Sequence, residues 1–180
     1  MIIDIFKAYA AVAVSKYLFA SYADELFVVA VSSTSVILGH MFPVAMRFKG
    51  GKGLACLGGS LLAYSFPIAM IFLAVELILV FVVDYLVVVP ITGSIAYVIV
   101  YAIRGGSWYG TAILSLVPIA MLYRHRTNFK RIREGKEAHF SFLWKREEEM
   151  NRVKEACSDE EFETFLIKEK KSKKTKEVEK

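Results

Sequence analysis

A short loop rich in glycine and lysine is the segment best suited to chemistry. Residues 48–53 read Phe-Lys-Gly-Gly-Lys-Gly and lie between two apolar stretches. Three glycines free the backbone to wrap closely around a ligand, and two lysines supply positive charge, so the loop could cradle a phosphate group. It lacks the spacing of a Walker A loop and of a dinucleotide-binding fingerprint. Taken alone, it is more typical of an ordinary cytoplasmic turn.

A second basic segment contains a histidine. Residues 123–131 read Tyr-Arg-His-Arg-Thr-Asn-Phe-Lys-Arg, and His125 and Asn128 share a face if the segment is helical. An imidazole between cationic side chains could take or hold a proton while Arg124 and Arg126 hold a phosphoryl group. The alternative is that these residues are only the basic flank of a last apolar helix.

The remaining reactive residue types give weaker signals. His40 lies at the inner end of another apolar stretch, where a histidine taken alone is more often structural. Cys56 and Cys157 form no CxxC pair, and neither has a His or Cys neighbour at metal-ligand spacing. We therefore expect two free thiols and no metal.

The chain divides into an apolar part and a charged part. Of its 180 residues, 56% are hydrophobic, which is too many for an ordinary soluble domain of this size. Residues 1–123 contain 6 Lys or Arg and 5 Asp or Glu, whereas residues 124–180 contain 17 and 13. We expect a transmembrane domain over residues 1–137 and a charged, helical cytoplasmic tail over residues 138–180, with a disordered Lys-rich end. No cleaved signal peptide is expected, because no basic segment precedes the first apolar stretch.

Six apolar stretches predict an all-α, polytopic membrane bundle of about six transmembrane helices. Basic residues gather in the loops on one side, so the positive-inside rule predicts a multi-pass protein of the cell (inner) membrane with both termini cytoplasmic. Glu76 lies within a span and is expected to face the bundle. Gly58 and Gly59 are expected to let neighbouring helices approach closely. The stretches are residues 5–20, 26–48, 54–66, 67–83, 85–103 and 107–123.

Together, the motifs closely resemble the acyl-phosphate-dependent glycerol-3-phosphate acyltransferase family, often called PlsY. Asp4 and Lys7 also resemble the Asp-x-x-Lys that opens the second span of that family. None of the three histidines is followed five positions later by Asp, the signature of coenzyme-A-dependent acyltransferases. The resemblance rests on residues 39–44 (Gly-His-Met-Phe-Pro-Val), residues 48–55, residues 123–131, Gly135 and Glu137.

The resemblance implies transfer of an acyl group from acyl phosphate to the 1-hydroxyl of glycerol 3-phosphate, which gives lysophosphatidate and inorganic phosphate. The implied partners are these two substrates and the lipid bilayer, with no nucleic acid, cofactor or metal. By resemblance, His125 and Asn128 are the catalytic candidates. The implied phosphate-binding residues are Gly50, Gly51, Lys52, Gly53, Arg124 and Arg126, and the further candidates are His40 and Glu137.

Two departures from the family pattern bear on the active site. The family's first loop, Gly-Ser-Gly-Asn-x-Gly-Ala-Thr-Asn followed by an arginine, has no counterpart here. Three explanations stay open: a missed upstream start, a partner chain that supplies the loop, or loss of catalysis. Val87 stands where the family has a serine. The main alternative is therefore a non-catalytic membrane paralogue that binds a phospholipid precursor or regulates a true acyltransferase, and a transporter subunit is the third reading.

Overall fold

All regular structure in the described part of the chain is helical, as predicted. The computed structural model describes residues 1–21, 23–48, 50–143, 145–158, 162, 164, 166 and 167. The chain divides into two compact units, Met1–Arg126 and Thr127–Lys180. The predicted domain boundary, after residue 137, lies further along the chain. The predicted disorder of the Lys-rich end falls outside the described residues.

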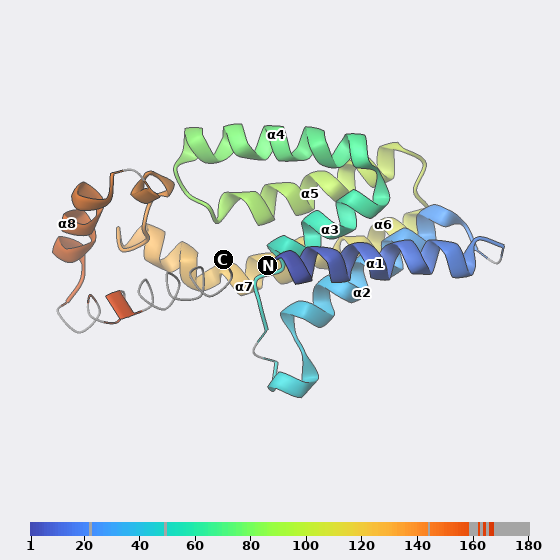
Figure 1. Ribbon diagram of the computed structural model, residues 1–180, viewed down its shortest axis with the longest axis horizontal. Helices are drawn as coiled ribbons and strands as arrows, with labels where there is room; N and C mark the ends of the chain where they lie inside the picture. Colours follow the sequence, from blue (N-terminus) through green and yellow to red (C-terminus); the bar gives the residue numbers. More distant parts are fainter. Residues whose placement is uncertain are drawn as a thin grey trace. The chain divides into compact units, whose positions relative to one another are not determined.

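The first unit is a bundle of apolar helices (Figure 1). In it, α1 packs against α2 and α3, α2 packs against α6, and α4 packs against α3 and α5. The core between them includes the fully buried Ile37, Met41, Tyr97 and Tyr101. The elements are α1 Ile2–Phe19, α2 Glu25–Met41, η1 Val44–Met46, α3 Leu54–Tyr64, α4 Phe66–Val83, α5 Val88–Ile103, α6 Trp108–Leu114 and the first part of α7 Leu116–Arg133.

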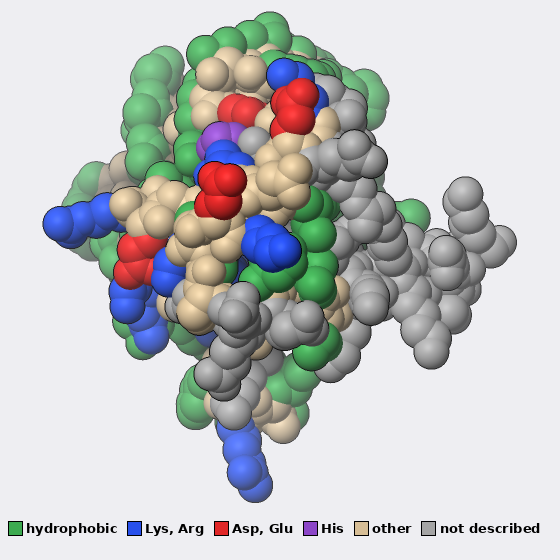
Figure 2. Space-filling model, turned by 90° about the vertical axis from the view of Figure 1, so that its left-hand side faces the viewer, with side chains coloured by type: hydrophobic (Ala, Val, Ile, Leu, Met, Phe, Trp, Pro, Cys, Tyr) green, Lys and Arg blue, Asp and Glu red, His purple; other side chains and the backbone are tan. Residues whose placement is uncertain are grey.

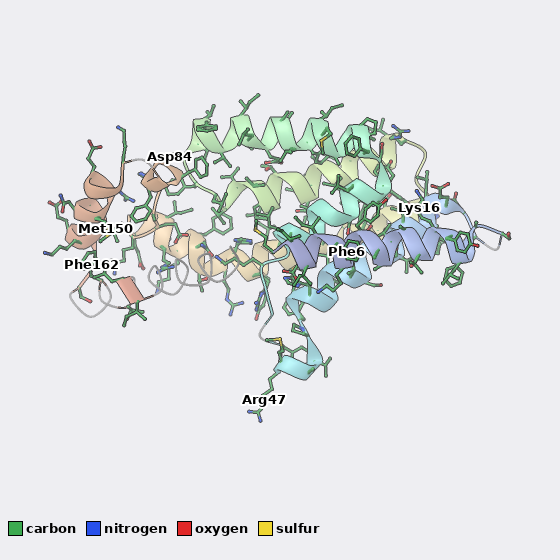
Figure 3. All side chains as sticks on the ribbon, viewed as in Figure 1. Phe6, Lys16, Arg47, Asp84, Met150 and Phe162 are labelled. Atoms are coloured by element: carbon green, nitrogen blue, oxygen red, sulfur yellow. The ribbon has the colours of Figure 1, made fainter. Side chains whose placement is uncertain are left out.

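Local signals set the ends of these helices. The Asp24 carboxylate caps α2 by accepting from the Phe27 N–H at 3.2 Å, as expected for an Asp at an N-cap. Asp84 ends α4 with a left-handed backbone (φ 62°) and lies in the turn between α4 and α5 (Figure 3). Pro43 follows α2 and ends the helix before the glycine-rich loop.

Among the residues that the structure describes, two helical segments are long and apolar enough to cross a membrane. They are Glu25–Met46, with 22 residues, and α4, with 18 residues. Only 11% of α4 is buried, although it is the more apolar of the two, and exposure of so much apolar surface fits contact with lipid better than contact with water. The helices α3 and α5 are apolar but shorter. The presence of about six transmembrane helices therefore stays a prediction.

The last expected span is broken in the structure. Residues 107–123 form two helices that separate at Ser115, because Pro118 has no N–H to donate to the Leu114 carbonyl. The Ser115 hydroxyl donates to the Thr111 carbonyl at 2.7 Å, which also accepts from the Ser115 N–H at 3.0 Å. The expectation of a single helix there was wrong for this physical reason.

Glu76 faces the bundle, as predicted. Both of its carboxylate oxygens lie within 3.0 Å of the Thr92 hydroxyl on α5. The neighbouring Gly93 leaves room for this contact, because a Cβ there would lie 3.3 Å from Glu76 Oε1. The pair joins α4 to α5 and keeps a polar group away from lipid.

The second unit is short and charged. It contains the end of α7, the 3-10 helix η2 (Phe140–Leu143) and α8 (Arg146–Ala156). Arg152 of α8 donates to the carbonyls of Gly135 and Glu137, both at 2.8 Å. Figure 2 shows acidic and basic side chains interspersed over the face that it draws.

One of two adjacent glycines brings α1 and α3 together. A Cβ at Gly59 would clash with the backbone carbonyl oxygen of Ile5 and would lie 3.0 Å from the Ala8 Cβ, whereas a Cβ at Gly58 would meet nothing within 4 Å. The prediction of close packing is therefore confirmed for Gly59 but not for Gly58. The difference follows from the helix, because adjacent residues point about 100° apart.

We expect the Gly59→Ala variant to unfold at a lower temperature than the wild type. The added methyl group must push α1 away from α3, and overpacking of this kind costs about 1–3 kcal/mol. Gly58→Ala is the matched control and should be neutral or stabilising, because Ala is the better helix former. Thermal unfolding of both variants in the same detergent tests this expectation, and equal unfolding temperatures would contradict it.

Candidate active site

The glycine-rich loop is pressed against the end of α2. The Gly51 N–H donates to the His40 carbonyl at 3.2 Å. A side chain at Gly50 would clash with that carbonyl and with the Pro43 ring, and a side chain at Gly51 would clash with the His40 imidazole. Gly53 begins α3 with a positive φ of 86°, which favours glycine. Before the loop, the side chain of Arg47 points away from the helices (Figure 3).

Arg124 holds the same loop through its carbonyl groups. Its guanidinium donates to the carbonyl of Gly50 and, at 3.2 and 3.3 Å, to that of Gly51. The guanidinium also lies over the Phe42 ring, 5.6 Å from its centroid. In the structure, Arg124 therefore fixes the backbone of the loop. Its contact with a phosphate group of a substrate stays a prediction. Arg126 instead stacks on the Tyr123 ring at 4.1 Å.

His125 is a buried, neutral imidazole. It is 3% exposed, and neither ring nitrogen has a well-aligned hydrogen-bond partner among the described residues. Burial, helped by the positive charges of Lys52 and Arg124, lowers the pKa of His125 to about 4, although the Lys52 backbone acts in the opposite direction. The structure thus associates His125 with Lys52, two residues that the sequence places in separate motifs.

Two further candidates are bonded to each other in the second unit. Asn128 Nδ2 donates to Glu137 Oε1 at 2.6 Å, and Arg131 pairs with the other carboxylate oxygen at 3.6 Å. With the Arg152 bond to its carbonyl, Glu137 ties together several segments of this unit. The predicted catalytic role of Asn128 and the candidacy of Glu137 stay predictions.

The sequence did not indicate how His40 is held. Its Nδ1 lies 3.4 Å from Asp4 Oδ1 and 3.4 Å from Lys7 Nζ, both on α1. Only a tertiary contact between α1 and α2 creates this cluster, so the short Asp-x-x-Lys pattern was its one signal.

Asp4 and His40, together with Cys56, form the one group of three or more possible metal ligands among the described residues. The donor atoms of Asp4, His40 and Cys56 lie within 4.8 Å of one another. The ammonium of Lys7 lies beside the His40 nitrogen, however, and its positive charge disfavours a cation there. The expectation of no metal stays a prediction.

These features define a class of protein: an apolar helical bundle with a basic, glycine-rich loop beside a buried histidine. The comparison with known proteins then identifies the family. A model of the glycerol-3-phosphate acyltransferase family matches residues 1–135, so the chain belongs to this family. The predicted resemblance is confirmed over residues 1–135, which carry all of its motif residues except Glu137.

Individual relatives agree with this assignment. A glycerol-3-phosphate acyltransferase of Lactiplantibacillus plantarum is 32% identical over 120 residues, which are 66% of this chain and 58% of the relative. One of Legionella pneumophila is 33% identical over 162 residues, which are 89% of this chain and 57% of the relative. The chain therefore spans less than two thirds of either relative.

Solved structures share the fold. The crystal structure of PlsY, an integral membrane glycerol 3-phosphate acyltransferase, in its glycerol 3-phosphate form has a TM-score of 0.67 and 27% identity. The match covers 78% of this chain and 68% of that one. The lysophosphatidic acid form gives a TM-score of 0.66.

The low pKa of His125 predicts a pH-dependent stability. An unfolded histidine with a pKa near 6.5 takes up a proton that folded His125, with a pKa of about 4, does not. Stability should therefore fall as the pH is lowered between these two values and change no further through this group below them. Unfolding temperatures measured across this range should show the fall, and His125→Gln should show a shallower one. NMR titration of the ring near pH 6.5 would contradict the assignment.

Proposed function

We propose that this protein transfers an acyl group from acyl phosphate to glycerol 3-phosphate. The hydroxyl oxygen attacks the acyl carbonyl carbon, and the bond from that carbon to the phosphate oxygen breaks. The hydroxyl proton leaves with the departing phosphate, so the products are lysophosphatidate and inorganic phosphate. The observation that carries the proposal is membership of the glycerol-3-phosphate acyltransferase family over residues 1–135. The glycerol 3-phosphate and lysophosphatidic acid forms of PlsY support the substrate and the product.

The geometry of the first unit is compatible with this chemistry. Both substrates are anionic, and the loop presents the exposed Lys52 next to a backbone that Arg124 fixes. Acyl phosphate is already activated, so orientation of the substrates and stabilisation of the departing phosphate supply much of the rate. In this proposal the neutral imidazole of His125 accepts a hydrogen bond from the attacking hydroxyl once substrate binding opens access to its buried ring nitrogens. In this proposal no metal or cofactor takes part.

The proposed setting is the cell (inner) membrane. About six spans, with both termini in the cytoplasm, would place residues 50–53 and His125 at the cytoplasmic face, where glycerol 3-phosphate is available. The exposed apolar surface of α4 supports contact with lipid. The residues of the first family loop would come from an upstream segment or from a partner chain.

A non-catalytic paralogue is the second candidate, and one observation favours it. Val87, at the position where the family pattern has a serine, is 6% exposed and precedes α5. A valine has no hydroxyl group to offer a substrate there. Such a paralogue would keep phospholipid-precursor binding, or regulate a true acyltransferase, without turnover.

Release of inorganic phosphate separates the two candidates. We expect the purified chain in phospholipid vesicles to release phosphate only when both acyl phosphate and glycerol 3-phosphate are present. Lys52→Ala should reduce this release at least about tenfold, because the loop loses a charge-assisted contact to phosphate. The matched control is Lys154→Ala, which removes an exposed lysine of α8 and should leave the rate unchanged.

The outcomes are distinct. Release that requires both substrates and falls only in Lys52→Ala supports the enzyme. A folded wild-type protein without release, but with measurable glycerol 3-phosphate binding by calorimetry, supports the paralogue. Equal rates in both lysine variants would remove Lys52 from the proposed site.

A further inference from the structure

The imidazole of His40 is fixed along one edge by α1. Its Nδ1 lies 3.4 Å from the Asp4 carboxylate and 3.4 Å from the Lys7 ammonium, and these two charges lie 3.6 Å apart. Asp4 accepts a hydrogen bond when Nδ1 carries a proton, and Lys7 donates one when it does not. The ring is therefore held by the same edge in either tautomer.

The opposite edge of the ring contacts the glycine-rich loop. A Cβ on Gly51 would clash with His40 Nε2 and would also lie 2.9 Å from Cε1. The backbone of His40 takes part as well, because its carbonyl accepts from the Gly51 N–H at 3.2 Å. Since Arg124 holds the carbonyls of Gly50 and Gly51, the loop is held by two residues that it meets through tertiary contacts.

We propose that Asp4 is a positioning residue for the glycine-rich loop: it sets the His40 ring against Gly51, and the ring sets the orientation of residues 50–53. Asp4 acts through His40 and does not itself need to contact a substrate. Because Gly51 lies against Nε2, the ring acts in this proposal as a support for the loop. For its kinetic consequence the inference rests on the proposed function, in which this loop handles phosphate.

The change that isolates this role is Asp4→Ala, with Glu25→Ala as the matched control. Glu25 also pairs with a lysine of α1, Lys16, at 2.8 Å. This second ion pair joins α1 to α2 at their other ends, next to the turn between them. A general loosening of the two helices should appear in both variants, whereas the proposed effect on the loop should appear only in Asp4→Ala.

The first readout does not depend on activity. In the full-length protein in vesicles, amide hydrogen exchange should be faster at Gly51 in Asp4→Ala by about tenfold, because the support of its hydrogen bond is lost. Asp4→Asn, which keeps a hydrogen-bond acceptor for the ring, should restore most of the protection. Glu25→Ala should exchange like the wild type at this position. Unchanged exchange in Asp4→Ala would overturn the inference, whether or not the protein is an enzyme.

The second readout is kinetic. Asp4→Ala should raise KM for glycerol 3-phosphate by about tenfold while kcat changes by less than about threefold, as expected when binding of a substrate is weakened before the chemical step. In a His40→Gln background, the Asp4 change should add little, because both residues act through one contact. Loss of kcat at unchanged KM, or multiplying effects in the double variant, would contradict the inference.

Failure of the proposed function gives a different result. A wild-type protein without turnover, together with faster Gly51 exchange in Asp4→Ala, would keep Asp4 as the support of the loop and would reject catalysis by this chain. Suppose instead that the wild type turns over, and that Gly51 exchanges at the wild-type rate in both Asp4→Ala and Glu25→Ala. This result would support the proposed enzyme activity and reject the positioning role of Asp4.

Discussion

The candidate site depends on the hydrogen bonds that fix the backbone of residues 50–53. A loop that is rich in glycine gains access to unusual backbone conformations, but it loses more conformational entropy on ordering than other sequences do. In this protein, Arg124 donates to two of its carbonyl groups and His40 accepts from one of its N–H groups. Hydrogen bonds to a charged donor are stronger than neutral ones. The loop is thus ordered by contacts from outside its own segment.

This arrangement requires α2 and α7 to bring His40 and Arg124 to the same part of the loop. His40 must end α2 beside the loop, and α7 must continue past its apolar part so that Arg124 reaches the same backbone. The close approach of α3 to α1 at Gly59 brings Asp4 and Lys7 to the end of the bundle where His40 lies. Packing of small residues, which drives association of helices in lipid, therefore also positions the charged cluster.

Much of the architecture could be predicted from the sequence, because it follows from local patterns. Apolar stretches and their breaks indicated helices. The position of Glu76 within an apolar run indicated that it faces the bundle, where the Thr92 hydroxyl donates a hydrogen bond to its carboxylate. The break at Ser115 was missed because the apolar pattern continues through it, although Pro118 was a visible signal. The pattern also could not distinguish Gly58 from Gly59, since both are small and only the direction of each Cα–Cβ bond separates them.

The candidate site was less predictable, because its contacts join residues that are distant in the sequence. The residue types indicated phosphate chemistry. They did not indicate that the Arg124 guanidinium donates to loop carbonyls or that Asp4 contacts the His40 ring. These contacts suggest a division of charge within the first unit. Arg124 donates to loop carbonyls and Lys7 pairs with a carboxylate, whereas the side chain of Lys52 is exposed on the surface of the loop. A buried neutral His125 beside such cations suits this division, because an imidazolium there would add a positive charge that burial penalises.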